Sequence, residues 1–449
     1  MIMGRLFGTD GIRGIAGDTL TAETAYKLGV AIGNVLKNKN EKMRVFIGKD
    51  TRLSGDMLEC ALSSGLCASG ADAVLLGVVP TPAVAYLVCK NGADAGVMIS
   101  ASHNKWEYNG LKVFSSRGYK LDDELEYQIE DIILGNTKAE TVSRDEIGRV
   151  YALDGAKEDY QNHIKALLPE KFDMPRRVLI DLANGSASAT AKDIFVSNGN
   201  VTYDFMSDMP NGTNINDKCG STELDMLKAR VKAEGYDIGI AFDGDADRCL
   251  CVDENGEKID GDKILSLFSV ELKKQNKLKN NTLVVTCLSN LGVFKMADKN
   301  GINIETTSVG DRYVLQRMIE GDFSVGGEQS GHIILSDYAT TGDGEMTAAF
   351  ILSILSAYKK TSSELFSIMT PLPQVSINVA ATDEQKQKSK TDENLKNEVK
   401  KVSDYLGENG RILLRPSGTE ALIRIMLEGE DVEKIKALGE KIAEVVKKL

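Results

Sequence analysis

Short apolar runs recur along most of the chain, and stretches with helical periodicity separate them. The runs that predict buried strands are 44–47, 73–76, 96–99, 177–180, 238–242 and 283–287. Strands that alternate with helices in this way are typical of parallel or mixed sheets covered by helices. The pattern therefore predicts an α/β fold.

Three other segments predict helices of different character. The nearly unbroken apolar stretch at 346–358 is too short to cross a bilayer and predicts a core helix. Residues 383–401 are rich in Lys and Glu, which is typical of a helix with a solvated face. In 431–449, apolar residues follow helical spacing and lysines occupy the last turn, where the helix dipole favours cations. We expect this last helix to pack against its domain and to take no part in catalysis.

The length of the chain points to several domains. A chain of 449 residues exceeds what one hydrophobic core usually supports. Breaks in the pattern fall at 153–155, at 255–256 and at 371–373, after which the composition becomes more charged. The predicted domains are therefore residues 1–153, 154–255, 256–370 and 371–449.

Charge and cysteine content exclude several kinds of partner and compartment. A net charge of -12 argues against binding to nucleic acid or to an anionic membrane, because both need a basic surface. The seven cysteines lack metal-ligand spacing, and residues 1–11 lack the apolar core of a signal peptide. We therefore expect a protein of the reducing cytoplasm. The pattern does not decide the oligomeric state, and a homodimer stays open.

Three aspartates at alternate positions follow the predicted strand 238–242. Asp243, Asp245 and Asp247 form a compact set of oxygen ligands, which suits a hard cation such as Mg²⁺. Only three histidines occur in the chain, and no close Cys/His pair does, so we do not expect zinc. The carboxyl end of a parallel strand is a common place for a ligand site. An acidic turn between two strands is the alternative, because Asp and Gly are frequent in turns.

A serine occupies the corresponding position after the predicted strand 96–99. Ser102 lies in the sequence ASHN at 101–104. Its hydroxyl needs a base, a metal ion or prior phosphorylation to react, and the candidates are His103, Lys112 and the aspartate loop. No G-x-S-x-G elbow surrounds it, which argues against a hydrolase of that type. A helix N-cap is the alternative role.

Four motifs in this order resemble those of the α-D-phosphohexomutase family. They are ASHN at 101–104 with NGLK at 109–112, the aspartate loop at 243–247, GEQSGH at 327–332, and RPSGTE at 415–420 with Arg424. The resemblance begins at FGTDGIRG, residues 7–14, and covers nearly the whole chain. It implies three similar mixed α/β domains followed by a smaller α+β C-terminal domain, arranged around a central cleft.

Within this family, a few positions most resemble the members that act on glucosamine phosphates. These positions are the opening FGTDGIRG, the GEQSGH form of the sugar loop and VGDRY at 309–313. Members that act on mannose or glucose phosphates usually carry GEMSGH, and a Gly-His pair where Gly310-Asp311 stands. Lys105 and Ala421 depart from the family pattern, because proline is common at both positions. Neither change removes a reacting group, although proline would have stiffened both loops.

The resemblance implies a set of site residues. The implied catalytic residues are Ser102, His103, Lys112, Arg13, Arg248 and His332. The implied substrate-binding residues are Glu328, Ser330, Arg415, Ser417, Gly418, Thr419 and Arg424. The implied ligands of one Mg²⁺ ion per chain are Ser102, Asp243, Asp245 and Asp247. Among the catalytic residues, Lys112 and His332 are candidates for acid/base work or charge stabilisation, and the two arginines for phosphoryl contacts.

The implied activity is that of an isomerase that moves a phosphoryl group on a phosphosugar. Phosphorylated Ser102 passes its phosphoryl group to O1 of glucosamine 6-phosphate. The resulting glucosamine 1,6-bisphosphate turns around and returns its 6-phosphoryl group to the serine. The family places this step in amino-sugar metabolism, on the route to peptidoglycan precursors.

Three alternatives to this activity stay open. The first is a mutase of the same family that acts on mannose or glucose phosphates. The second is a Mg²⁺-dependent sugar phosphatase, in which an aspartate would carry the phosphoryl group. The third is a catalytically silent binding protein with the same fold, although such a protein would be expected to have lost Ser102 or an aspartate.

Overall fold

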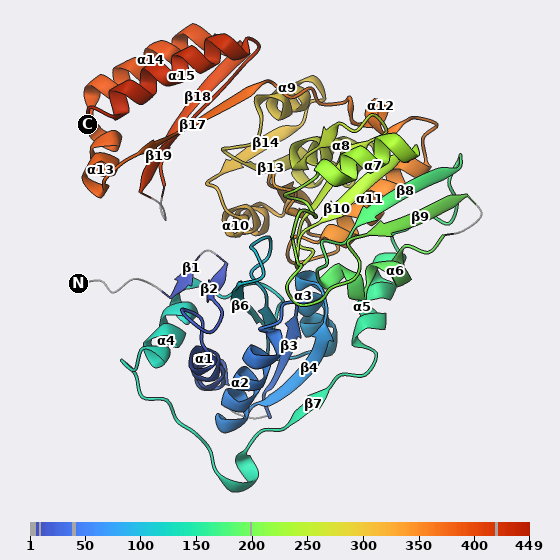
Figure 1. Ribbon diagram of the computed structural model, residues 1–449, viewed down its shortest axis with the longest axis vertical. Coiled ribbons are helices and arrows are strands. Elements are labelled where there is room, and N and C mark those ends of the chain that lie inside the picture. The colour runs from blue at the N-terminus through green and yellow to red at the C-terminus, as the bar shows by residue number, and fades with distance from the viewer. Residues whose placement is uncertain (1–5, 9, 38–41, 198–199, 418–420) are drawn as a thin grey trace. The chain divides into compact units, whose positions relative to one another are not determined.

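The computed structural model describes residues 6–8, 10–37, 42–197, 200–417 and 421–449 (Figure 1). The chain forms two compact units. The first consists of Met1–Leu288 and Ile302–Ile368, and the second of Ser289–Gly301 and Met369–Leu449. Within the described ranges, the first unit contains three separate sheets and the second contains one.

The first sheet is mixed, and its strands lie in the order β1-β2-β6-β5-β3-β4-β7. They are β1 (Phe7–Gly8), β2 (Gly11–Ile15), β3 (Arg44–Lys49), β4 (Asp72–Val78), β5 (Ala95–Ile99), β6 (Tyr108–Ser115) and β7 (Val150–Ala152). Strand β3 is parallel to β4 and β5, whereas β6 is antiparallel to β5. The accompanying helices are α1 (Ala22–Val35), α2 (Gly55–Ala68), α3 (Thr81–Asn91) and α4 (Asp123–Ile133). Leu28, Leu62 and Val97 belong to the core between these helices and the sheet.

The second sheet has the order β12-β11-β10-β8-β9. Its strands are β8 (Arg176–Asp181), β9 (Val201–Met206), β10 (Ile238–Phe242), β11 (Cys249–Asp253) and β12 (Lys258–Ile259). Strand β8 is parallel to β9 and β10, whereas β11 is antiparallel to β10. The accompanying helices are α5 (Ala156–Lys165), α6 (Ala191–Ile194) and α7 (Asp225–Glu234).

The third sheet has the order β14-β13-β15-β16. Its strands are β13 (Thr282–Thr286), β14 (Asn303–Thr307), β15 (Val325–Gly327) and β16 (Ile333–Leu335). The helices of this part are α8 (Gly261–Lys274), α10 (Asp311–Gly321), α11 (Gly344–Ser356) and α12 (Ser362–Phe366). Helices α8 and α10 contact the third sheet, but α11 packs against β10 and β11 of the second. The apolar helix expected at 346–358 is therefore confirmed as a core helix, and it lies on a neighbouring sheet.

The three sheets share one arrangement of four strands. The orders β4-β3-β5-β6, β9-β8-β10-β11 and β14-β13-β15-β16 correspond to one another. In each, three parallel strands are followed by one antiparallel strand, which a hairpin joins to the last parallel strand. The apolar runs named as strands all lie in these sheets, and most are fully buried. The same topology thus recurs three times without a visible sequence repeat.

The second unit is built on an antiparallel sheet with the order β17-β19-β18. Its strands are β17 (Gln374–Ala380), β18 (Gly410–Pro416) and β19 (Leu422–Gly429), and its helices are α9 (Leu291–Lys299), α13 (Asp383–Thr391), α14 (Glu393–Leu406) and α15 (Val432–Val446). Helices α14 and α15 run side by side along the sheet, where their apolar residues contact it (Figure 1). The predicted C-terminal packing helix is confirmed. Helix α9 joins this unit because the amide of Leu291 donates to the buried Glu428 carboxylate at 2.9 Å.

The predicted fold class is confirmed, since three mixed α/β domains precede a C-terminal domain with an antiparallel sheet. Short 3₁₀ turns complete the connections: η1 (Arg144–Glu146), η2 (Ser186–Ala189), η3 (Lys279–Asn281) and η4 (Gly407–Asn409). The domain limits and the central cleft stay predictions. The second sheet extends to Ile259, past the expected break at 255–256, because β12 pairs with β11. Across the described ranges, no helix has the length and apolar character needed to span a membrane.

Close contact between α1 and α2 depends on two glycines. A Cβ atom on Gly65 would collide with the carbonyl of Tyr26, and one on Gly29 would lie 2.7 Å from the amide of Leu66. Both obstacles are backbone atoms, which cannot turn away as a side chain can. These glycines therefore set the distance between α1 and α2, two of the helices that accompany the first sheet.

We expect Gly65→Ala to lower the free energy of unfolding by about 1–3 kcal/mol, because the methyl group forces the two helices apart. Ser64→Ala is the matched control, since Ser64 is the exposed neighbour of Gly65 in α2 and its loss should change stability by less than about 0.5 kcal/mol. Thermal unfolding of both variants measures the difference. Equal midpoints for Gly65→Ala and the wild type would contradict the packing argument.

Candidate active site

The three corresponding hairpins of the first unit carry most of the predicted site residues. The loop between β5 and β6 carries Ser102, and the loop between β10 and β11 carries the three aspartates. The loop between β15 and β16 carries Glu328, Ser330 and His332. Each loop begins at the carboxyl end of a parallel strand, where the ligand sites of α/β sheets form. Direct contacts between these loops make one site of them.

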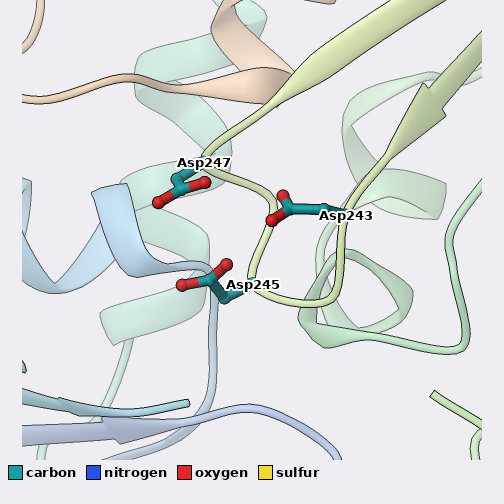
Figure 2. Close-up of side chains that lie close together, drawn as sticks. All are labelled: Asp243, Asp245 and Asp247. Atoms are coloured by element: carbon teal, nitrogen blue, oxygen red, sulfur yellow. The ribbon is translucent and has the colours of Figure 1, made fainter. Parts of the chain in front are cut away.

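Asp243, Asp245 and Asp247 form a buried cluster and point toward a common space (Figure 2). One carboxylate oxygen from each lies within 4.8 Å of the other two. Burial, reinforced by the charges of Asp247 and Asp245, raises the pKa of Asp243 well above its usual range. One oxygen of Asp245 and one of Asp247 are buried without a hydrogen-bond partner. These residues fit a hard divalent cation, which would offset the repulsion and bind the unpartnered oxygens.

Two helix N-termini hold the backbone of the aspartate loop. The amide of Thr81, at the start of α3, donates to the carbonyl of Asp245 at 2.9 Å, and its hydroxyl donates to the Asp245 carboxylate. The amide of Gly344, at the start of α11, donates to the carbonyl of Ala246 at 2.9 Å. Ala246 itself has a left-handed backbone with φ 54°. The loop is therefore fixed in a sharp turn between two helices.

The acidic-turn alternative explains only part of this loop. The amide of Arg248 donates to Asp243 Oδ1 at 3.2 Å, so one aspartate does shape the turn. A turn alone would leave the remaining carboxylates in solvent, where charge costs little. Here all three are buried, which favours the metal-site interpretation.

Ser102 faces the aspartate cluster directly. Its hydroxyl donates to Asp243 Oδ2 at 2.6 Å, and the residue is 1% exposed. Its backbone lies in the left-handed region at φ 54°, which is uncommon for a residue with a side chain. The N-cap alternative is wrong, because the next helix in the chain begins only at Asp123. The loop geometry therefore aims the hydroxyl at a candidate metal ligand.

Sequence reasoning missed the residues that hold the Ser102 loop. Arg52 and Asn216 donate to its backbone carbonyls, and Asp50 accepts a hydrogen bond from Ser100 within it. Asp50 follows strand β3 as the Ser102 loop follows β5, so position after a parallel strand was an available signal for it. Asn216 lies in a long irregular segment, and no sequence pattern marks it.

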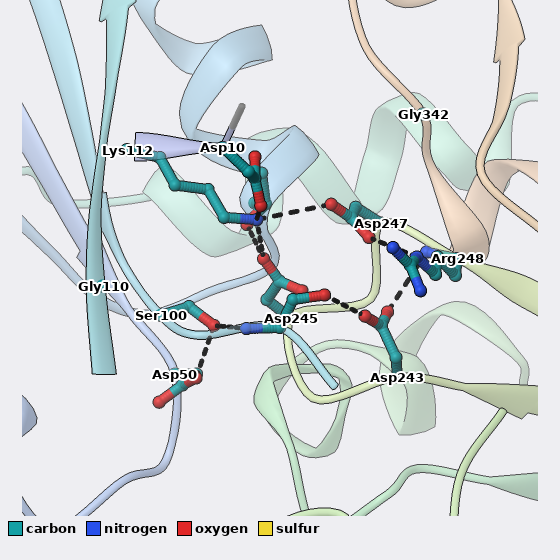
Figure 3. Close-up of polar contacts among 12 residues, drawn as sticks. Asp10, Asp50, Ser100, Gly110, Lys112, Asp243, Asp245, Asp247, Arg248 and Gly342 are labelled. Carbon is teal, nitrogen blue, oxygen red and sulfur yellow. Dashed lines mark hydrogen bonds and ion pairs between the residues drawn. The ribbon is translucent and has the colours of Figure 1, made fainter. Parts of the chain in front are cut away.

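Lys112 lies at the centre of a buried charge network (Figure 3). Its Nζ is 2.7 Å from Asp245, 3.0 Å from Asp10 and 3.4 Å from Asp247. Although burial opposes the charge, Asp10, Asp245 and Asp247 raise the pKa of Lys112 well above its usual range. The amine is therefore a cation in this arrangement, able to stabilise negative charge, and its raised pKa opposes release of the proton.

Asp10 extends this network and was not predicted. Despite burial, Lys112, Lys120 and Arg13 hold the pKa of Asp10 well below its usual range. Lys120 also contacts Asp311 at 2.6 Å. Arg13, a predicted catalytic residue, pairs with Asp10 through its guanidinium. FGTDGIRG thus contributes through its aspartate as well as its arginine.

His103 follows Ser102 and is neutral near pH 7. Burial, with Arg248 and Arg13 nearby, lowers the pKa of His103 to about 4. Its Nδ1 is buried without a hydrogen-bond partner. The lowered pKa makes this imidazole a weak base, so the structure leaves its predicted catalytic role a prediction.

Arg248 and His332 flank the aspartates from the other side. Arg248 Nε lies 3.9 Å from Asp247, within the network drawn in Figure 3. His332 Nδ1 lies 3.7 Å from Asp247, and its Nε2 accepts a hydrogen bond from the amide of Gly342 at 3.1 Å. Although burial opposes it, Asp247 and Asp311 raise the pKa of His332. Because Nε2 is the acceptor, Nδ1 carries the proton and faces Asp247.

The predicted sugar loop is held at its base and leaves Glu328 partly exposed. The amide of Gly310 donates to Glu328 Oε1 at 3.1 Å, and Ser330 Oγ lies 3.5 Å from Glu328 Oε2. The amide of Gly261 donates to the carbonyl of Gln329 at 3.0 Å. The carboxylate and hydroxyl thus lie together, and Gly310, a position at which the sequence resembles the members that act on glucosamine phosphates, contacts the carboxylate.

The predicted phosphate-binding residues lie in the second unit. Arg415 on β18 is directly paired with Arg424 on β19, so both side chains lie on one face of the sheet. The amide of Ser417 donates to the carbonyl of Leu422 at 2.9 Å, which closes the hairpin. Gly418 and Thr419 lie outside the described residues. Two guanidinium groups on one face suit an anionic group such as a phosphate.

The first-unit site combines the parts needed to carry a phosphoryl group. A serine hydroxyl contacts one ligand of a candidate cation site, and lysine and arginine surround that site. Such groups can hold a phosphoserine and stabilise the charge of a transferring phosphoryl group. The partly exposed carboxylate and hydroxyl of the sugar loop can bind hydroxyl groups of a polyol.

Four family models match consecutive parts of the chain. All describe phosphoglucomutase/phosphomannomutase: alpha/beta/alpha domain I at residues 4–140, domain II at 158–256, domain III at 260–372 and the C-terminal domain at 377–445. The phosphoglucosamine mutase of Caldicellulosiruptor saccharolyticus is 49% identical over 447 residues, which cover 99% of each chain. That of Clostridioides difficile is 46% identical over 445 residues, again covering 99% of each.

Solved structures show the same fold at lower identity. A phosphoglucomutase/phosphomannomutase family protein from Burkholderia thailandensis is 23% identical, with a TM-score of 0.81 over 99% of this chain and 98% of that one. The N-acetylphosphoglucosamine mutase of Aspergillus fumigatus, solved with GlcNAc-6P and magnesium, is 17% identical, with a TM-score of 0.70 over 98% and 95%.

We expect Mg²⁺ to stabilise the protein and Asp243→Asn to abolish that effect. Mg²⁺ at about 100 times its Kd should raise the free energy of unfolding by about 2.7 kcal/mol. With EDTA present, Asp243→Asn should unfold at or above the wild-type temperature, because one of three mutually repelling carboxylates is removed. Thermal unfolding with EDTA and with Mg²⁺ gives both comparisons.

Asp217→Asn is the control, since this carboxylate is exposed and lies outside the cluster. It should keep the wild-type response to Mg²⁺. If Asp243→Asn keeps the full magnesium-induced shift, the aspartate cluster is not the metal site.

Proposed function

The chain belongs to the phosphoglucosamine mutases of the α-D-phosphohexomutase superfamily, and we propose that it interconverts glucosamine 6-phosphate and glucosamine 1-phosphate through a phosphorylated Ser102. The observation that carries this proposal is the 2.6 Å hydrogen bond from the Ser102 hydroxyl to Asp243, inside the aspartate cluster. This contact places a candidate nucleophile directly beside a candidate cation site, which is the arrangement that a phosphoryl carrier needs.

Ser102 acts as the phosphoryl carrier in this proposal. Its phosphate, with a charge of about -1.5 to -2 at neutral pH, passes to O1 of glucosamine 6-phosphate and leaves a free serine. The glucosamine 1,6-bisphosphate then turns around, and its 6-phosphoryl group returns to the serine oxygen. The product is glucosamine 1-phosphate, and the phosphoserine is restored. The bisphosphate therefore also serves as the activator of an unphosphorylated chain.

The aspartates and Ser102 are proposed to hold one Mg²⁺ ion. When bound, this ion supplies positive charge that offsets the phosphate and the carboxylates. The fit rests on the unpartnered buried oxygens of Asp245 and Asp247 and on the all-oxygen ligand set. Lys112 and Arg248 add charge stabilisation from the protein itself.

Proton transfer is assigned to groups beside the carrier. His103 is proposed as the proton acceptor for a sugar hydroxyl or for Ser102 because its Nδ1 is buried without a partner, although its pKa of about 4 makes it a weak base. Lys112 remains protonated, and because its raised pKa opposes release of the proton, it is proposed to stabilise negative charge. His332 orients Asp247 through its Nδ1 proton, and Arg13, next to Asp10, contacts the phosphoryl group.

Glu328 and Ser330 are proposed to read the sugar 3- and 4-hydroxyls. These hydroxyls keep equivalent positions when the bisphosphate turns around, whereas a loop that read O1 or O6 would serve one orientation only. Arg415, Ser417, Gly418, Thr419 and Arg424 are proposed to bind the phosphate that is not reacting. Binding of the remote phosphate orients the reacting end in both half-reactions.

The compartment and pathway complete the proposal. All seven cysteines are free thiols, which supports the reducing cytoplasm. The product would feed amino-sugar metabolism toward peptidoglycan precursors. Size-exclusion chromatography of the same preparation decides between a monomer and a homodimer.

We expect Ser102→Ala to abolish both phosphorylation and isomerisation. Purified protein is incubated with glucosamine 6-phosphate, Mg²⁺ and a trace of the 1,6-bisphosphate. Formation of the 1-phosphate is followed, and peptide mass spectrometry locates phosphate. Wild type should carry phosphate on Ser102 and isomerise the sugar, while Ser102→Ala does neither. Ser64→Ala, which removes an exposed serine from α2, should match the wild type.

The same assay separates the alternative functions. Faster turnover of mannose or glucose 6-phosphate would make the chain a mutase of different specificity. Release of inorganic phosphate with label on Asp243 would identify a phosphatase. Binding of the sugar without turnover or label would identify a silent binding protein.

We expect Arg415→Ala to lower kcat/KM by about 10–100-fold in both directions, because one charged hydrogen-bonding group to phosphate is lost. Phosphorylation on Ser102 should still be detectable at high bisphosphate, since the carrier is intact. Lys436→Ala, an exposed change on α15 of the same unit, is the control and should leave kcat/KM unchanged. An unchanged kcat/KM for Arg415→Ala would contradict its proposed role in binding the phosphate that is not reacting.

A further inference from the structure

A closed ring of hydrogen bonds surrounds the peptide of Ser102. Its amide donates to the Ser100 hydroxyl at 2.9 Å, and that hydroxyl donates to Asp50 at 2.6 Å. Asp50 accepts from Arg52 Nε at 2.9 Å, and Arg52 Nη2 donates to the Ser102 carbonyl at 2.8 Å. Both polar groups of the Ser102 backbone are thus held, although this backbone is left-handed.

Arg52 extends its hold beyond that peptide. Its Nη2 also donates to the carbonyl of Asn104 at 2.9 Å, and its Nη1 donates to the carbonyl of Lys105 at 2.6 Å. The Asp50 and Arg52 side chains are both 0% exposed. A buried guanidinium that donates to three carbonyls of one loop fixes the shape of that loop.

Asn216 reaches the same carbonyls from the domain of the second sheet. Its Nδ2 donates to Ser102 O at 2.9 Å and to Asn104 O at 3.0 Å. Because both partners are carbonyl oxygens, the amide nitrogen must face them. The backbone of Asn216 is anchored in its own domain, since its amide donates to Ala183 O at 2.9 Å.

The aspartate loop at 243–247 lies against this contact. A Cβ atom on Gly244 would come within 2.6 Å of the Ser102 carbonyl and 2.8 Å of Asn216 Nδ2. The missing side chain of Gly244 therefore makes room for the carbonyl and the amide. Asn216 thus joins the carrier loop to the domain that supplies all three aspartates.

We propose that Arg52 and Asn216 are positioning residues that fix the Ser102 peptide against the aspartate loop, an inference that rests on the proposed phosphoserine mechanism. Arg52 sets the shape of the carrier loop from within its own domain. Asn216 sets the distance between that loop and the aspartates across a domain boundary. Their contacts to the loop are with backbone carbonyls, so their effect reaches the reaction only through the placement of Ser102 Oγ.

This role predicts a specific kinetic pattern. A misplaced nucleophile slows each transfer, whereas the sugar loop and the remote phosphate site are unchanged. We expect Asn216→Ala and Asn216→Asp to lower kcat by about 10–100-fold with KM within about threefold of wild type. Arg52→Lys, which keeps the charge but cannot reach three carbonyls, should show the same pattern. Phosphorylation of Ser102 by the 1,6-bisphosphate should slow in parallel.

The test measures kcat, KM, the rate of Ser102 phosphorylation and the thermal midpoint of each variant. Asp217→Ala is the matched control, because Asp217 is the exposed neighbour of Asn216 and should behave as wild type. A folded Asn216→Asp variant with wild-type kcat and phosphorylation rate overturns the proposal. A rise in KM without loss of kcat also overturns it, because that result would place Asn216 in substrate binding.

Two further observations keep the test decisive. If the variants do not fold, a crystal structure of phosphorylated wild type answers the question: Asn216 Nδ2 must remain within hydrogen-bond distance of Ser102 O. A longer distance would overturn the proposal. Absence of both phosphorylation and isomerisation in the wild type would instead refute the proposed function, so the two failures are distinguishable.

Discussion

The repulsion among three buried carboxylates is the constraint on which the first unit depends. Two like charges about 4 Å apart repel by roughly 4 kcal/mol at an effective dielectric constant of 20. Lys112 offsets the charge next to Asp245 and Asp247, and Arg248 lies farther from Asp247. Among the described residues Asp243 forms no ion pair, and although the charge of Arg248 opposes it, burial with the charges of Asp247 and Asp245 raises the pKa of Asp243. The unfavourable charge is thus concentrated at the carboxylate that meets Ser102, which is where a cation would stabilise most.

This constraint explains why so many elements converge on one loop. Thr81 is the first residue of α3 and Gly344 is the first residue of α11, and the amides of both donate to carbonyls of the aspartate loop. Two helix N-termini therefore direct their positive ends toward the aspartates. The three sheets meet through hairpins that occupy the same place in one repeated topology. One hairpin carries Ser102, one carries the three aspartates and one carries Glu328 and Ser330. The site is therefore assembled from equivalent positions of three modules.

Local pattern was sufficient to predict the strands, the α/β class and the loops that carry Ser102 and the aspartates. Those features depend on residues that are close in sequence. An apolar run predicts a buried strand, and polar residues that follow it lie at the edge of the sheet where ligands bind. Asp10, Arg52 and Asn216 could not be found in this way, because their roles arise from contacts with residues far away in the chain. The packing of α11 against the second sheet also depends on contacts between residues far apart in the chain, so the sequence pattern did not predict it. Gly418 and Thr419 lie outside the described residues, so their predicted role stays a prediction.

The three corresponding hairpins differ in how tightly they contact one another. The β5–β6 hairpin contacts the β10–β11 hairpin through the hydrogen bond from Ser102 to Asp243, and Asn216 donates to the carbonyl of Ser102. A displacement of one hairpin would therefore displace the other. The β15–β16 hairpin meets them mainly through His332, while Glu328 and Ser330 stand at its partly exposed tip. Substitutions at that tip would leave the contacts among Ser102, Asp243 and Asn216 in place. The recurring topology thus separates the partly exposed tip of one hairpin from the buried contacts that join the other two.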